Sequence, residues 1–169
     1  MKRLLSILLV LTLCLVSTPC NVSAKPKSKA IIVKNYEEYT LDNVTYKMPK
    51  GWEEITDSGF MYYYNDSNFA MVQTYDCEYG FDNQGMLDGF IDGLTGGEGV
   101  TLVSKKAKEF HDGITALTLE FNMKKSDKTF YIKSFSFVYE ETLYSFSIVS
   151  DLQKNTKILD KLTKKIVLE

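Results

Sequence analysis

Residues 100–149 are VTLVSKKAKEFHDGITALTLEFNMKKSDKTFYIKSFSFVYEETLYSFSIV, and the pattern in this stretch decides the fold. Runs rich in β-branched and aromatic residues alternate with short polar connections, which is typical of strands joined by turns. The pattern predicts four strands, at residues 100–110, 114–123, 129–139 and 143–149. Asp112-Gly113 lies between the first two and is a strong hairpin signal. The spacing therefore predicts an antiparallel meander.

A helix is expected directly before this meander, at residues 83–95. With about 100° between successive residues, apolar side chains fill one arc of this helix. They are Met86, Leu87, Phe90, Ile91 and Leu94. Asp82 is the expected N-cap, and the glycines after Thr95 are expected to end the helix.

Glycines recur at every fourth position of this helix, at Gly85, Gly89 and Gly93. Each glycine weakens a helix by about 1 kcal/mol relative to alanine, so the helix is expected to be weak on its own. One interpretation of the spacing is close contact between the helix and the sheet or a loop. The other is that the loose helix and its glycine-rich exit form an adaptable lip for a ligand.

Strands are also expected before the helix. Residues 39–41 and 44–48 predict a hairpin, because the Asp-Asn pair between them tolerates the positive φ that its turn needs. Residues 60–64 and 69–79 predict two further strands. In the longer one, period-two spacing puts four side chains on a single face: Phe69, Met71, Tyr75 and Cys77.

A second helix is expected at residues 152–165, with Ser150 or Asp151 as its cap. One face is apolar, with Leu152, Ile158, Leu159, Leu162 and Ile166, and the other face is rich in lysine. Runs of strands separated by single helices predict an α+β fold, in which two helices flank or sandwich one antiparallel sheet.

The first residues have the features of a cleavable export signal. Lys2 and Arg3 precede an apolar run at residues 4–16, and Val22-Ser23-Ala24 suits a signal peptidase. The run is too short for a membrane span, which needs about 20 residues. We therefore expect residues 1–24 to be removed near Ala24, leaving a secreted or envelope-associated product with no transmembrane span. Lipidation at Cys20 is the alternative, although the proline before it does not suit a lipidation motif.

The remainder has the size of a single domain. Residues 25–35 begin with a charged, proline-containing segment and are expected to form a flexible tether, and residues 36–169 form the domain. The net charge is −2, and removal of Lys2 and Arg3 makes it more negative, which argues against nucleic acid as a partner. Few cysteines, many lysines and a short leader suggest a protein that a bacterium exports.

No set of residues in the sequence is typical of a catalytic centre or a cofactor site. His111 is the only histidine and falls in a predicted hairpin turn, where no third group would hold it as a base. Cys77 is the only cysteine left after removal of the leader, so it cannot form an internal disulfide. It is expected to be a small buried side chain. A nucleophilic or dimer-forming Cys77 is the alternative.

Three groups of side chains are candidates for binding, and each also has an ordinary structural explanation. The tyrosine run Tyr62, Tyr63 and Tyr64 must point rings to both sheet faces, so some of them are expected to be exposed to a partner. The last helix is expected to present Lys157, Lys161 and Lys164 to an anionic polymer, a lipid surface or an acidic protein. The carboxylates of Asp82, Asp88 and Asp92 are candidates for Ca²⁺, or form a solvated helix face.

The hairpin that ends in Met48-Pro49-Lys50-Gly51-Trp52 resembles the start of PsbP-like domains, in which an aromatic residue follows a Pro-x-Gly turn. The later order of elements is similar too, so the resemblance covers residues 36–169. It implies an α/β/α sandwich around an antiparallel sheet. It also implies a non-catalytic binding or accessory role, and the family includes exported bacterial proteins of unknown role. The export-type leader argues against a photosystem role.

The function expected from these features is a secreted, non-catalytic binding or accessory module at the cell envelope, with a protein or an envelope polymer as partner. Two alternatives stay open. One is an extracellular hydrolase that uses surface carboxylates or Cys77. The other is a structural or adhesion component.

Overall fold

The computed structural model describes residues 30–55, 61–65, 67–76 and 83–169. The first half contains β1 (Tyr36–Leu41), β2 (Val44–Pro49), β3 (Glu53–Ile55), β4 (Met61–Asn65), β5 (Asn68–Asp76) and α2 (Asn83–Thr95). The second half contains β6 (Val100–His111), β7 (Ile114–Lys125), β8 (Lys128–Tyr139), β9 (Thr142–Ser150), α3 (Gln153–Thr156), α4 (Leu159–Leu162), the 3₁₀ helix η2 (Thr163–Lys165) and β10 (Val167–Leu168).

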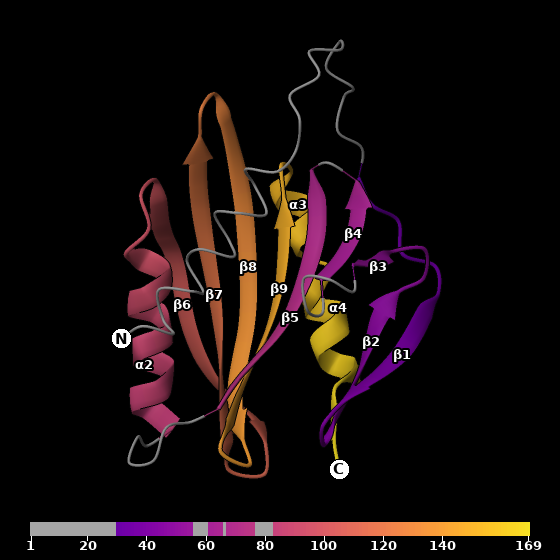
Figure 1. Cartoon of the computed structure of the whole chain (residues 1–169), viewed down its shortest axis with the longest axis vertical. Coiled ribbons are helices and arrows are strands. Elements are labelled where there is room, and N and C mark those ends of the chain that lie inside the picture. The colour runs from indigo at the N-terminus through magenta and orange to yellow at the C-terminus, as the bar shows by residue number, and fades with distance from the viewer. Residues whose placement is uncertain (1–29, 56–60, 66, 77–82) are drawn as a thin grey trace.

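A seven-stranded sheet forms the centre of the molecule (Figure 1). Its order is β3-β4-β5-β9-β8-β7-β6, and neighbouring strands are antiparallel. The predicted meander is confirmed: β6 to β9 pair in sequence order, with bounds close to those expected. Asp112-Gly113 makes the first turn, where Gly113 has φ of +75°. In the last turn Glu140 and Glu141 both have positive φ.

The first hairpin does not join this sheet, so the prediction of one sheet was wrong. β1 and β2 form a separate three-stranded sheet with the short C-terminal strand β10. The chain leaves β2 through a turn in which the Trp52 amide donates to the Pro49 carbonyl, and Gly51 has φ of +86°. This turn redirects the chain, so that Glu53 starts the large sheet instead of extending the hairpin.

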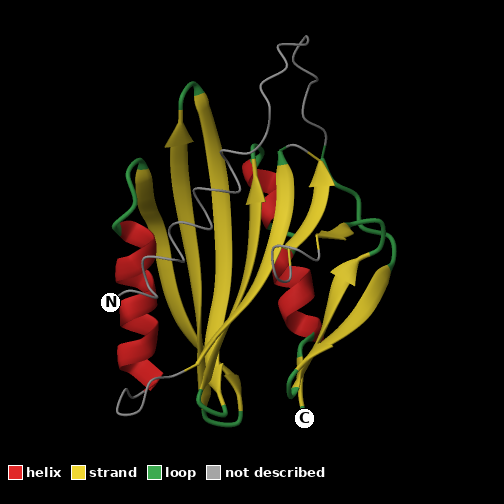
Figure 2. Ribbon diagram, in the orientation of Figure 1, coloured by secondary structure: helices red, strands yellow, loops and turns green. Residues whose placement is uncertain are grey.

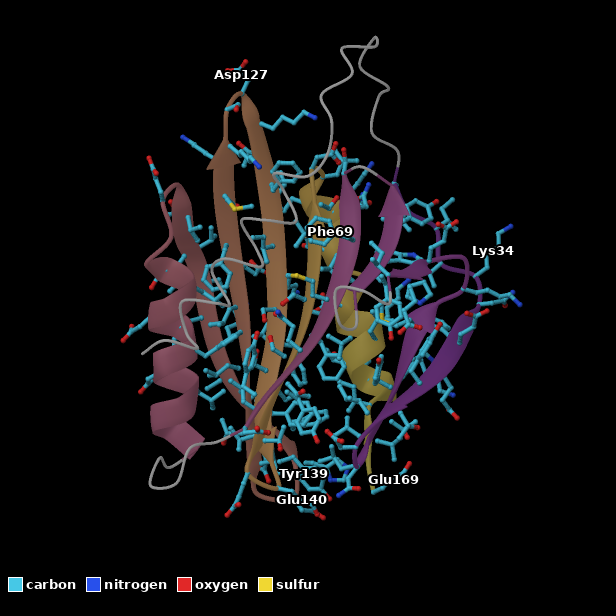
Figure 3. All side chains as sticks on the ribbon, in the orientation of Figure 1. Lys34, Phe69, Asp127, Tyr139, Glu140 and Glu169 are labelled. Atoms are coloured by element: carbon cyan, nitrogen blue, oxygen red, sulfur yellow. The ribbon has the colours of Figure 1, made fainter. Side chains whose placement is uncertain are left out.

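The C-terminus is fixed against the small sheet and the end of the large one. The Glu169 amide donates to the Asn43 carbonyl at 2.9 Å, and the Thr45 hydroxyl donates to the Glu169 carboxylate at 2.7 Å. From the large sheet, the Tyr139 hydroxyl donates to the Glu169 carbonyl, and Asn43 donates to Glu140. Figure 3 shows Tyr139, Glu140 and Glu169 together at one end of the molecule. The two sheets are therefore joined at this end.

Two apolar clusters lie on the two faces of the large sheet, with helices on both sides (Figure 2). α2 covers one face, and its buried Leu87, Phe90, Ile91 and Leu94 meet the odd-numbered side chains of β5 and β7. The small sheet, α3 and α4 cover the other face. This is the α/β/α sandwich expected from the sequence. Phe69, Met71 and Tyr75 share the α2 face as predicted, whereas Cys77 lies outside the described residues.

α2 has the predicted bounds, and Asp82, the expected cap, lies outside the described residues. After the helix, Gly99 has φ of +76°, and a Cβ there would come within 2.7 Å of the Lys124 carbonyl oxygen. Only glycine fits at this approach. A Cβ added at Gly89 would meet nothing within 4 Å, so close packing does not explain that glycine.

The predicted continuous C-terminal helix was wrong, because the segment is broken into α3, α4 and η2. The break follows a buried polar side chain. The Asn155 amide group donates to Asn68 at 3.0 Å and to Ser150 at 3.1 Å. The Ser150 hydroxyl also accepts from the Leu152 amide, but Leu152 is itself the N-cap of α3 and makes no side-chain capping hydrogen bond, so the predicted cap at Ser150 or Asp151 was wrong. The expected apolar face is confirmed at Ile158, Leu159, Leu162 and Ile166, which are all buried, whereas Leu152 is only half-buried.

The described part of the predicted tether, residues 30–35, is in contact with the fold. The Ile31 amide donates to Asn155 at 3.1 Å, and the Lys50 amide donates to the Asn35 carbonyl. Ile31 and Val33 also pack against the apolar cluster beside α4. The domain therefore starts to contact its core before the predicted boundary at residue 36.

Candidate functional site

An open groove of about 510 Å³ lies on the sheet face opposite α2. It forms because α3 and α4 pack on β8 and β9, while β6 and β7 extend beyond them at the end of the sheet. Its lining comes from β6 (Lys108, Glu109, Phe110, His111), β7 (Thr118), β8 (Lys133, Phe135) and the C-terminal segment (Leu159, Asp160, Thr163, Lys164, Ile166).

Aromatic rings form the floor of the groove. The ring centroids of Phe110 and Phe135 are 5.1 Å apart with nearly perpendicular planes, and Phe110 lies 5.0 Å from the buried Phe137. His111 adds an edge contact to Phe110 at 5.9 Å. These distances are in the range of favourable aromatic pairs, so the floor is an organised apolar surface.

A buried lysine forms an ion-pair network at the base of the groove. The Lys133 side chain is only 10% exposed, and its Nζ lies 2.6 Å from the Asp160 carboxylate and 3.5 Å from the Glu120 carboxylate. Glu120 is the cross-strand partner of Lys133 on β7, whereas Asp160 lies on α4. The network therefore joins α4 to the sheet and compensates the buried charge.

Removing Asp160 is expected to destabilise the fold, because Lys133 would keep only its more distant partner in a buried position. We expect Asp160→Ala to lower the free energy of unfolding by about 1–2 kcal/mol. Urea unfolding measures this change. The matched control is Glu38→Ala, which breaks the exposed pair between Glu38 and Lys47 and is expected to cost under about 0.5 kcal/mol. Equal losses in the two variants would contradict a structural role for the network.

A second, more enclosed cavity of about 220 Å³ lies on the other face, between α2 and the sheet. Apolar side chains make up most of its lining: Phe90 and Leu94 of α2, Val100, Phe121, Met123 and Ile132. The glycine-rich exit of α2 contributes Gly97 and Glu98, and the strands contribute Gln73, Ser134 and Ser147. The exit that the sequence suggested as a binding lip therefore borders a cavity.

Four buried serines form a cluster on adjacent strands, and two of them line this cavity. Ser134 is opposite Ser147 across β8 and β9, and Ser136 is opposite Ser145. The Ser147 hydroxyl donates to Ser134 at 3.1 Å, and Ser136 donates to Ser145 at 3.1 Å. Contacts of 3.3 Å join Ser134 to the other two hydroxyls. This serine cluster is a polar island in an otherwise apolar core.

The predicted tyrosine site is divided by the strand. Tyr62 is fully buried and shares a 2.7 Å hydrogen bond with the Tyr46 hydroxyl, so it belongs to the core and cannot meet a partner. Burial raises the pKa of the Tyr62 phenol. Tyr64 is 44% exposed, with its ring 5.5 Å from that of Trp52. The side chain of Tyr63 lies outside those described.

Only one of the three predicted lysines borders the groove. Lys157, Lys161 and Lys164 are all exposed, but only Lys164 is among the described residues that line the groove. The break between α3 and α4 separates Lys157 from the other two. Lys108, which the sequence did not single out, lines the groove with Lys164 instead.

The predicted Ca²⁺ ligands can be described only in part. Asp88 forms an exposed ion pair with Lys105 at 3.3 Å, Asp92 is exposed, and Asp82 lies outside the described residues. Within the part of the chain that is described, no three His, Cys, Asp or Glu side chains are grouped to hold a metal ion. The three-residue site stays a prediction.

Sequence reasoning missed Lys133, Phe110 and the serine cluster. A signal was present, because Lys133, Ser134 and Ser136 interrupt the apolar pattern on both faces of a central strand. Charged or small polar residues at such positions indicate a face that is incompletely covered or a cavity.

Among the described helices, none is long and apolar enough to cross a membrane.

No family model matches the sequence, and no curated protein matches it. The solution structure of cyanobacterial PsbP (CyanoP) from Synechocystis sp. PCC 6803 is similar, with 13% identity and a TM-score of 0.62, over 89% of this chain and 100% of that one. A Pseudomonas aeruginosa protein of unknown function has 10% identity and a TM-score of 0.48, over 76% of this chain and 93% of that one. The first likeness shows that this chain has the PsbP-like fold.

Proposed function

From a PsbP-like fold that carries an open, aromatic-floored groove, we propose that this protein is a non-catalytic binding module at or outside the cell envelope. The groove is the observation that carries the proposal. Its deepest ionisable group, Lys133, is engaged by Asp160 and Glu120, so these three side chains support the structure. The export signal expected in residues 1–24 supports the location.

The partner that best suits the groove is an acidic protein segment. Lys108 and Lys164 are exposed on its lining beside a single exposed glutamate, Glu109, and attract carboxylates, whereas the floor of Phe110 and Phe135 is apolar. A peptide offers carboxylates and apolar side chains on one chain. A phosphate-rich envelope polymer offers charge alone, and would leave the aromatic floor without a partner. The two features together therefore favour a peptide.

Fluorescence anisotropy with a labelled octapeptide of alternating Glu and Leu tests this proposal. We expect saturable binding that weakens with added salt, because the attracting charges are exposed. The double variant Lys108→Gln, Lys164→Gln is expected to weaken binding by about fivefold or more, since each charged contact is worth about 0.5–1 kcal/mol.

The matched control is the double variant Lys154→Gln, Lys157→Gln, which removes the same charge from exposed positions outside the groove lining. A larger loss of affinity in the groove variant than in the control supports binding in the groove. Equal weakening would show that only net charge matters, and the absence of binding to the peptide would contradict the acidic partner.

A further inference from the structure

The cavity beside α2 differs from the groove in its chemistry, and it supports an inference that does not depend on the groove. We propose that this cavity binds a small uncharged molecule with an apolar ring and one hydroxyl group. The hydroxyl would donate to Ser147, and the ring would lie among the apolar side chains of α2, β7 and β8.

The size and lining of the cavity suit a single ring. An apolar cavity of about 150 Å³ in another protein is known to hold benzene, so about 220 Å³ holds a ring with a short substituent. Phe90, Leu94 and Met123 line it, and all three are buried. A ligand that enters this space loses contact with water over its apolar surface, which favours binding.

Small polar residues at core positions contribute to the cavity, and two of them, Ser134 and Ser147, line it. On β8, Ile132 and Val138 are apolar and face the α2 side, but Ser134 and Ser136 stand between them. β9 repeats this pattern with Ser145 and Ser147. Protein cores are close-packed, and fully buried positions are mostly occupied by apolar side chains. Serine at all four positions removes volume at the centre of the sheet and supplies hydroxyls there.

The hydrogen-bond pattern determines which polar group the ligand needs. The Ser147 hydroxyl uses its proton to donate to Ser134. A hydroxyl oxygen can also accept two hydrogen bonds, and no described residue donates to Ser147. The free lone pairs therefore suit a ligand that donates a hydrogen bond, and an ether or a ketone would leave them unused.

The charge of the lining excludes an anionic ligand. Glu98, an exposed residue at the α2 exit, is the only charged side chain among the described residues of the lining. A carboxylate in the cavity would lose its hydration without gaining a cation, and it would be repelled by Glu98. The ligand is therefore uncharged.

Methyl NMR of the purified protein labelled at methionine tests this proposal. Met123 lines the cavity, and Met48, which is buried in the cluster on the opposite sheet face, is the internal control. Benzyl alcohol, toluene and benzoate are the probes. We expect the two uncharged probes to shift the Met123 signal in a saturable manner and leave Met48 in place. Benzoate is expected to have no effect at the same concentrations.

Ser147→Ala then separates the hydrogen bond from the hydrophobic effect. It is expected to lower the affinity for benzyl alcohol by about 3- to 10-fold and to leave the affinity for toluene unchanged, because only the alcohol donates to Ser147. Ser147→Leu, which fills the space, is expected to abolish both shifts. If it does not fold, Ser147→Ala alone decides. Equal weakening of both probes, a benzoate shift as large as that of the alcohol, or no Met123 shift at all would overturn the proposal.

Discussion

Replacement of Phe137 by alanine is expected to lower the free energy of unfolding by about 3–5 kcal/mol. Phe137 is fully buried on the central strand β8. Its ring stacks on Tyr144 with centroids 5.5 Å apart and on Phe146 at 6.2 Å, and Phe110 of the edge strand lies 5.0 Å away. Alanine would remove the ring that all three contact and leave a cavity between close-packed strands, which cannot collapse to fill it.

Urea unfolding followed by circular dichroism measures this loss. Domains have only about 5–15 kcal/mol of stability, so Phe137→Leu, with an expected loss of about 1–2 kcal/mol, provides a variant that stays folded. Phe135→Ala is the matched control. Phe135 lies on the same strand but is half-buried on the groove floor. Phe135→Ala is therefore expected to lower the free energy of unfolding by less than half as much as Phe137→Ala. Equal losses at the two positions would contradict the central place of Phe137 in this cluster.

The parts of the fold that the sequence predicted well are those determined by local patterns. Strands β8 and β9 bury side chains on both faces, and Asp112-Gly113 fixes the turn between β6 and β7 through backbone conformations available to few residues. Likewise α2 begins and ends where its apolar arc does. Neighbouring residues in the chain decide such features, so one sequence is enough to find them.

The features that the sequence did not predict depend on distant partners. Asn155 has good spacing for a helix, but its side chain bonds Asn68, 87 positions earlier in the chain, and the helix breaks there. β10 exists because Val167 meets Thr45 on the small sheet. Neither partner can be identified from a periodic pattern.

The candidate sites were missed for the same reason. The groove depends on how far α4 extends over the sheet and on the pairing of Lys133 with Asp160, which is a matter of tertiary packing. The cavity had a visible signal in the alternating serines of β8 and β9. Its meaning became clear only when the register placed Ser134 opposite Ser147 beneath α2.

Raising the pH from 9 to 11 is expected to lower the free energy of unfolding by about 3 kcal/mol, chiefly through Tyr62 and Tyr75, whose phenols have the most strongly raised pKa values. Burial is the main cause that raises the pKa of Tyr46, Tyr62 and Tyr75 above the ordinary value for a phenol. In the unfolded chain these phenols ionise near pH 10, so above that pH the unfolded state loses protons that the folded state retains. The stability is thus fully present below about pH 10 and is lost as the pH rises, by up to about 1.4 kcal/mol per unit for each tyrosine.

Urea unfolding at several pH values between 8 and 11, with tyrosinate absorbance recorded in parallel, measures this dependence. Ionisation is expected to accompany unfolding. Tyr75→Phe gives the clearest variant, because the Tyr75 hydroxyl is buried with no hydrogen-bond partner among the described residues. Its removal is expected to preserve or raise the stability at pH 7, since an unsatisfied buried group is costly, and to remove about half of the alkaline loss.

Tyr62→Phe separates the burial of a phenol from its hydrogen bond. This variant leaves the Tyr46 hydroxyl without its 2.7 Å partner, so it is expected to cost about 1 kcal/mol at pH 7 while it also reduces the alkaline loss. Tyr64→Phe, at an exposed ring, is the matched control, and its free energy of unfolding is expected to fall in alkali as much as that of the unmodified protein. If the three variants keep the same pH dependence, buried tyrosines do not cause it. If Tyr62→Phe and Tyr75→Phe each reduce it, the phenol-rich core on both sheet faces limits the stability of this protein in alkali.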